Sequence, residues 1–248
     1  MREFSHKVHW PLVERTRDRF VSRRSGNILR QIESGADADY LLGLAVDAFW
    51  TGLSCGWALE DEAVIVRGLE GLDRIHRTVL ASFSQEEIWE NSDLSTFLGS
   101  SVLSDDALLV EYAQALQGKP HKNRGQRTGE PVSHHLLDAY VAMIVGDEPG
   151  AQAAIQSART ALSLPEHPPS RVGPVLDMFD AILTRDQEQL DVASQAQVDN
   201  HALAHAPTKD SHSSPMALID AELTMLARIA AQRGLTVPPS SYLFTEAD

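Results

Sequence analysis

The stretch from Tyr40 to Leu59, YLLGLAVDAFWTGLSCGWAL, limits the possible folds more than any other part of the chain. Asp47 is its only charged residue, and apolar or small residues face every direction of a helical wheel. A helix that is apolar all round lies either inside a large core or across a membrane, and about twenty residues can cross a bilayer. No Lys or Arg anchor stands beside the stretch, and acidic residues flank it: Asp37, Asp39, Glu60, Asp61 and Glu62. We therefore predict a buried central helix, against which the helices expected at 61–82 and 104–118 pack.

The composition is that of a globular protein. Hydrophobic residues make up 43% of the 248 residues and charged residues 23%, which is enough for a real core. Cys55 is the only cysteine, so an intrachain disulfide is ruled out and a reducing compartment suits the chain. The N-terminus MREFSHKVHW has no apolar signal-peptide core, and we expect a cytoplasmic protein.

The charge is strongly negative and unevenly placed. A net charge of −14 repels nucleic acid and anionic membranes, so we expect neither as a partner, and it attracts cationic proteins. Residues 1–30 carry eight Lys/Arg against three acids. Residues 78–118 have no Lys, Arg or His and contain seven acids, here called the acidic sector: Glu86, Glu87, Glu90, Asp93, Asp105, Asp106 and Glu111.

Helical periodicity dominates the remaining chain. Apolar residues recur at helical spacing over 10–32, 61–82 and 104–116, and the sequence SQEE at 84–87 fits a capping box that opens a short helix through Leu98. We expect Ser104 to cap the next helix, and Ser214 to cap a last helix over 215–233 that ends at Gly234. No segment alternates with period two. The predicted fold is all-α, with antiparallel helical hairpins stacked as a compact or repeat-like bundle and no major sheet.

A weak internal repeat with an offset of 39 supports the stacked hairpins. The sequence LDAY at 137–140 matches LDMF at 176–179, and further matches follow at Ala142/Ala181, Asp147/Asp186, Ala154/Ala193 and Gln156/Gln195. Each copy reads as a helix, a turn with an Asp N-cap, and a second helix, as in helical-repeat proteins. The chain forms one all-α domain over 1–248, with possible subdomains 1–118 and 132–248 joined by an exposed basic loop at 119–131.

Three sets of residues could carry chemistry. His201 and His205 stand four apart, as in some metal sites, but no third ligand is evident and we interpret them as a solvated or capping pair. His134, His135 and Asp138 could likewise form a site, but they open a helix and suit surface and capping roles. Asp47 could act as a general base with a raised pKa, although it better suits a buried partner for an Arg or a helix N-terminus. No phosphate loop, nucleophile elbow or catalytic dyad spacing is present, so we predict no catalytic residue, no metal and no cofactor.

The C-terminal half resembles the Imm49 family of bacterial immunity proteins, which are helical antitoxins encoded beside polymorphic or secreted toxins. The resemblance is carried by FDAILTRDQEQL at 179–190 and LARIAAQRGLTVPPSSYLF at 226–244, and it covers about residues 135–245. Arg233-Gly234 and Tyr242-Leu243 match the usual ending of the family, whereas Phe244 stands where Pro is usual. The resemblance implies a helical scaffold that binds a toxin, and it transfers no catalytic residue.

These observations favour a stoichiometric immunity protein whose acidic sector binds a basic, nuclease-like toxin domain. The sector is also compatible with an ordinary solvated helix face. A second hypothesis is an adaptor or regulator that binds a peptide or protein in a groove of the helical repeat. A third is a metal-dependent enzyme that uses His201 and His205.

Overall fold

The predicted central helix is confirmed. The computed structural model describes residues 1–35, 41–82, 94–103, 105–118, 132–163, 172–207 and 214–245. A π-helical turn, η2 (Leu41–Ala45), leads into α4 (Val46–Leu59), in which Phe49, Leu53 and most of the other residues are buried. Asp47 contradicts the expectation of a buried partner, because it lies on the one exposed stripe of α4.

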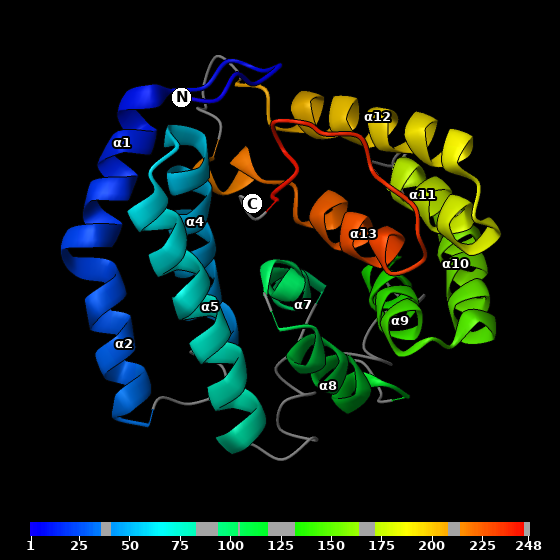
Figure 1. Cartoon of the computed structure of the whole chain (residues 1–248), viewed down its shortest axis with the longest axis horizontal. Coiled ribbons are helices and arrows are strands. Elements are labelled where there is room, and N and C mark those ends of the chain that lie inside the picture. Colours follow the sequence, from blue (N-terminus) through cyan, green and yellow to red (C-terminus); the bar gives the residue numbers. More distant parts are fainter. Residues whose placement is uncertain are drawn as a thin grey trace.

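The N-terminal half packs around α4. Helices α1 (Trp10–Arg19) and α2 (Ser25–Glu33) form one rod joined by a π-helical turn, η1 (Phe20–Arg24), as the periodicity over 10–32 predicts. This rod and α5 (Glu62–Ser82) lie alongside α4 (Figure 1). The rings of Phe20 and Phe49 meet edge to face at 5.3 Å. Helix α8 departs from the prediction, because it packs mainly against α9 and α5 rather than against the central helix.

The other described elements are arranged around the last helix, α13 (Ala221–Ala231) (Figure 1). Their bounds are α7 (Leu94–Leu98), η3 (Gly99–Val102), α8 (Asp106–Leu116), α9 (Val132–Val145), α10 (Glu148–Leu162), α11 (Gly173–Thr184), α12 (Gln187–Ala204), η4 (Pro215–Leu218) and α13 (Ala221–Ala231). The described part of the chain contains helices and turns but no strand, so the all-α prediction is confirmed. None of the described helices is both long and apolar enough to cross a bilayer.

Three helical hairpins share one turn geometry. In α4–α5, α9–α10 and α11–α12 a left-handed residue is followed by an aspartate whose N–H donates to the carbonyl five residues earlier, which is the helix-ending pattern of a Schellman motif. The left-handed residues are Glu60, Gly146 and Arg185, and the bonds are Asp61–Gly56 at 2.9 Å, Asp147–Ala142 at 2.8 Å and Asp186–Ala181 at 2.9 Å. Each aspartate then accepts a hydrogen bond from the N–H three residues later: Val64 at 3.3 Å, Gly150 at 3.0 Å and Gln189 at 2.9 Å.

Two helix starts differ from the prediction. Asp105 caps α8, accepting from the backbone N–H groups of Ala107 and Leu108, while Ser104 lies outside the described residues. The predicted helix over 215–233 is broken: Ser214 caps only the 3-10 turn η4, Ile219 is extended, and Asp220 caps α13. The break lets Ile219 and the tail after Gly234 both enter the core.

One apolar core runs through both halves, from Phe20 to Phe244. In the C-terminal half the repeat positions Tyr140 and Phe179 meet edge to face at 4.7 Å. The capping box at 84–87 and the basic loop at 119–131 lie outside the described residues.

Candidate functional site

The acidic sector is only partly described. Glu86, Glu87, Glu90 and Asp93 lie outside the described residues, and Asp105, Asp106 and Glu111 lie on or next to α8. The structure brings Asp105 and Asp106 together at the N-terminal end of α8, between α5 and α13. Glu111 faces solvent farther along the same helix.

Asp105 has a structural role at this end of α8. Besides capping the helix, its carboxylate accepts a hydrogen bond from Arg77 of α5 at 2.7 Å, and Arg77 also pairs with Asp73 at 2.8 Å. The Arg77 guanidinium, followed by the backbone N–H of Leu108, holds the pKa of Asp105 below its usual value. Asp105 therefore joins α8 to α5. Because Arg77 neutralises much of its charge, Asp105 contributes little to the attraction of a cationic binding partner.

Asp106 joins α8 to α13 in a similar way. Its carboxylate pairs with Arg228, whose guanidinium also donates to the Ser101 carbonyl at 3.3 Å. The Arg228 side chain is only 16% exposed, whereas that of Asp106 is 70% exposed. The carboxylate thus neutralises a cation set into the surface while remaining accessible itself.

Glu111 makes no hydrogen bond or ion pair with the part of the chain that the structure describes, and its side chain is exposed. It is the acid of the described sector whose charge faces solvent without an internal partner. A charge in this position contributes to the field that a cationic protein meets on approach.

A groove of about 390 Å³ lies beside Asp106. Its walls come from η3, α13 and the C-terminal tail, and its lining combines apolar side chains with one ion pair: Ser101, Val102, Leu103, Asp106, Thr224, Ala227, Arg228, Leu243, Phe244 and Thr245. The surface around α8 therefore has an apolar groove with a charged rim, which is the usual make-up of a protein-binding patch.

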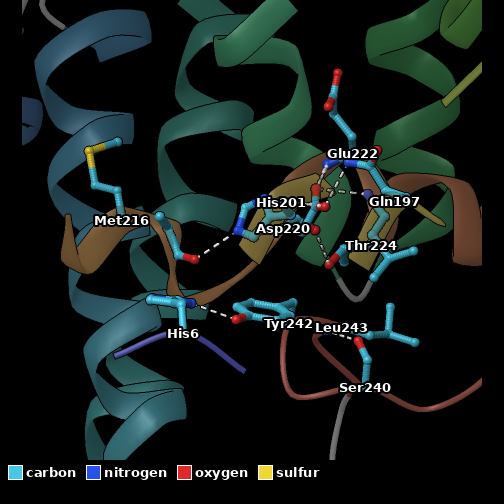
Figure 2. Close-up of polar contacts among 12 residues, drawn as sticks. His6, Gln197, His201, Met216, Asp220, Glu222, Thr224, Ser240, Tyr242 and Leu243 are labelled. Carbon is cyan, nitrogen blue, oxygen red and sulfur yellow. Dashed lines mark hydrogen bonds and ion pairs between the residues drawn. The ribbon is translucent and has the colours of Figure 1, made fainter. Parts of the chain in front are cut away.

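A buried polar network behind this groove fixes the tail (Figure 2). The Asp220 backbone N–H donates to the Tyr242 carbonyl at 2.9 Å, and the Asp220 carboxylate accepts from the Gln197 side chain at 2.8 Å. The Thr224 hydroxyl donates to the Asp220 carbonyl at 2.8 Å and accepts from the Phe244 N–H at 3.3 Å. The groove wall formed by Leu243 and Phe244 is thereby held on α13.

The N-terminal segment closes the same network. His6 Nδ1 lies 2.5 Å from the Tyr242 hydroxyl (Figure 2). The Ser5 hydroxyl lies 3.1 Å from the same hydroxyl. Burial, and then the nearby charge of His201, lower the pKa of His6. The first residues of the chain are therefore part of the fold and meet the tail from the other end of the sequence.

His201 belongs to this network, so its interpretation as a solvated side chain is wrong. Its Nε2–H donates to the Ala217 carbonyl at 2.8 Å, and its Nδ1 lies 3.3 Å from the Asp220 carboxylate. Both ring nitrogens thus face oxygen atoms of the protein, and the ring packs on His205 at 4.6 Å and on Tyr242 at 5.0 Å. Within the described ranges, no three His, Cys, Asp or Glu side chains are grouped as metal ligands.

Glu222 and Tyr140 lie close to the same aspartate. Burial first, and the charge of Asp220 second, raise the pKa of Glu222 to about 8. The fully buried Tyr140 hydroxyl has no hydrogen-bond partner among the described residues, and burial followed by the charges of Glu222 and Asp220 raises its pKa.

Sequence patterns identified the acids but missed their partners. Arg77 and Arg228 lie 28 and 122 residues from the aspartates they bind, and no local pattern reports such a distance. Asp220 could have been found, because Asp followed by Ala-Glu-Leu opens a helix as an N-cap with an acidic first turn.

Comparisons with protein-family models, with curated proteins and with solved structures found no match. The resemblance over residues 135–245 therefore rests on the sequence segments that carry it.

Proposed function

We propose that this chain is a cytoplasmic immunity protein that binds a cognate bacterial toxin stoichiometrically, without catalysis. The toxin surface that it recognises is basic, as in a nuclease that binds nucleic acid. The contact surface is the exposed side of α8 with Glu111 and Asp106, together with the groove beside Asp106.

The observation that carries this proposal is the excess of acids on a helical scaffold. The chain has 35 Asp and Glu against 21 Lys and Arg. Such a field raises the rate at which a cationic protein associates, and speed matters for a protein that must reach a toxin before the toxin acts. Rigid helical packing behind α8 supports the same role, because a preformed surface loses little conformational entropy on binding.

The resemblance of the C-terminal half adds independent support. The residues that carry it form the end of α11, the start of α12, the end of α13 and the tail, and Tyr242 and Leu243 are buried. Their role is structural, which agrees with a resemblance that implies a helical scaffold and transfers no catalytic residue.

The test uses the toxin encoded beside this gene. Co-expression of the chain with that toxin should restore growth of bacteria that the toxin alone kills. In vitro, toxin activity should fall linearly with added protein and reach zero at one chain per toxin. Complete loss of toxin activity at much less than one chain per toxin would indicate catalysis and contradict the proposal. Toxin activity that an excess of the chain leaves unchanged would also contradict it.

A second candidate function, an adaptor that binds a peptide, is favoured by the repeated hairpins. The hairpins α9–α10 and α11–α12 follow each other with the same turn, as in proteins that bind peptides along stacked repeats. A groove of about 400 Å³ lies on the first of them, between α9 and α10, and contains Val141, Ala142 and Ala154. Substituting Ala154→Arg should abolish peptide binding there but leave binding of a basic toxin to α8 unchanged.

A further inference from the structure

A basic groove lies between the N-terminal rod and α5 of this acidic protein. It has a volume of about 550 Å³. Four arginines line it, Arg23 and Arg30 from the rod and Arg67 and Arg74 from α5, against one acid, Glu70. Pockets that hold small molecules commonly measure about 300–1,000 Å³, so the size suits a small ligand.

The arginines are positioned by contacts that leave other N–H groups available. Arg67 donates through one nitrogen to the Val21 carbonyl at 3.0 Å, and Arg74 pairs through one nitrogen with Glu33 at 2.9 Å. Arg30 donates to the Asn27 side chain. A guanidinium has five N–H donors, so each of these side chains is anchored and can still bind an anion.

Arg23, the fourth arginine of the groove, is exposed, and it makes no hydrogen bond or ion pair with the described residues. Four guanidiniums around one concavity repel one another. Within the described residues, the groove lining and its ion pairs supply two carboxylates against them, Glu70 and Glu33. An anionic ligand would relieve this repulsion.

The backbone also shapes the groove. The rod changes from α-helix to π-helix at Phe20–Arg24, and the Ser25 hydroxyl donates to the Phe20 carbonyl at 2.9 Å. Single π-helical turns within helices occur frequently at functional sites. Gly26 follows this turn and lines the groove, and a Cβ atom added there would meet nothing within 4 Å.

We infer that this groove binds an oligophosphate, either free, as in pyrophosphate, or as the phosphate chain of a nucleotide. Arginine forks bind phosphate oxygens in pairs, and two linked phosphates carry several negative charges in a small volume. The inference is independent of toxin binding, which involves α8 and the groove beside Asp106, because no residue that lines one groove lines the other.

The test is calorimetric titration of the purified full chain with sodium pyrophosphate, ADP and orthophosphate at constant ionic strength. Pyrophosphate should bind saturably and at least tenfold more tightly than orthophosphate. ADP binding equal to pyrophosphate would identify the linked phosphates as the ligand, and tighter ADP binding would identify a nucleotide. Orthophosphate binding as tightly as pyrophosphate, or no saturable binding of any probe, would overturn the inference.

Two neighbouring residues give a matched pair of variants. Arg23→Glu should weaken pyrophosphate binding at least tenfold, whereas Arg24→Glu makes the same charge change next to the groove lining and should weaken it less than threefold. Equal losses would mean a diffuse charge effect and contradict a defined site. Gly26→Leu should also weaken binding at least tenfold without changing any charge, and its thermal unfolding midpoint should not fall, because Leu favours a helix more than Gly.

A heptaglutamate peptide serves as the competing ligand. Peptide binding that is tighter than pyrophosphate binding and equally sensitive to Arg23→Glu would assign the groove to an acidic protein segment and refute the oligophosphate. Weaker peptide binding would support the inference.

Discussion

At the scale of single residues, two buried tyrosines show how a hydrogen-bond partner decides whether a buried hydroxyl stabilises or destabilises the fold. The Tyr242 hydroxyl contacts His6 and Ser5, whereas the equally buried Tyr140 hydroxyl has no partner in the described structure. Burying a hydroxyl without a hydrogen bond costs stability, and a made bond restores it.

This contrast predicts opposite effects of the same substitution. Tyr242→Phe should lower the free energy of unfolding by about 1–2 kcal/mol, because His6 is left unsatisfied in the interior. Tyr140→Phe should leave it unchanged or raise it by up to about 1 kcal/mol, because only an unpaired group is removed. Urea denaturation of both variants measures this, and similar losses in the two would refute the hydrogen-bond assignments.

His6 also predicts how stability depends on pH. Its pKa is lowered in the folded protein, while in the unfolded chain it lies near about 6.5. Below about pH 6.5, His6 binds a proton more readily in the unfolded chain than in the folded protein, and this favours unfolding. The contribution of His6 to stability is therefore complete above about pH 6.5 and is lost as the pH falls toward the lower pKa of the folded state.

Glu222 has a raised pKa, so its contribution to stability increases as the pH falls and partly masks the effect of His6. Comparison with the variant His6→Asn, which keeps Glu222, isolates the contribution of His6. Between pH 7 and 5.5 the free energy of unfolding should fall more steeply in the unmodified protein than in the variant. Parallel curves would show that His6 does not titrate differently on folding.

At the scale of elements, the sequence predicts helices well because their signals are local. The rod at 10–32, α5, α9–α10 and α11–α12 follow from periodicity and from Asp N-caps. The turn of α4–α5 lies outside the repeat of offset 39 from which the other two hairpins follow, so the sequence does not predict that it shares their geometry. The break at Ile219 has one local signal, the Asp220 N-cap, and one long-range contact, the hydrogen bond from the Asp220 N–H to the Tyr242 carbonyl of the tail, which the sequence does not predict.

The turn at Arg185 predicts a stabilising substitution. A non-glycine residue in the left-handed region costs about 1–2 kcal/mol relative to its usual conformation, and glycine avoids most of this cost. Arg185 has a φ of +56°, so Arg185→Gly should raise the thermal unfolding midpoint, while Arg185→Ala should not. Removing the adjacent N-cap by Asp186→Ala should lower stability by about 1 kcal/mol. A lower midpoint for Arg185→Gly would contradict the turn geometry.

At the scale of the whole molecule, the core joins the two halves that the loop at 119–131 separates in sequence. Helix α8 packs on α9, and η4 packs on α4. These contacts link residues far apart in the chain, and periodicity carries no information about them. The positions of the arginine partners of Asp105 and Asp106 depend on the same long-range packing, which is why the candidate site could be only partly predicted.

The shared core predicts cooperative unfolding. All four tryptophans lie in the N-terminal half: Trp10, Trp50, Trp57 and Trp89. Trp50 and Trp57 also donate to carbonyls of the C-terminal half, those of Met216 and Ser241. Their fluorescence therefore reports on the N-terminal half and its contacts with the C-terminal half, whereas circular dichroism at 222 nm reports on every helix. The two signals should give the same denaturation midpoint, as expected for one cooperative unit. Separate midpoints would show that 1–118 and 132–248 unfold as independent subdomains.

The salt dependence of association with the cognate toxin tests the proposed function most directly. Glu111→Lys on α8 is compared with Glu14→Lys, which makes the same reversal at an exposed site on α1, away from α8 in Figure 1. At about 50 mM salt Glu111→Lys should slow association about two- to fivefold, the control should have little effect, and the difference should disappear at about 500 mM salt. Equal rate constants for the two variants and the unmodified chain at low salt would contradict binding through the acidic side of α8.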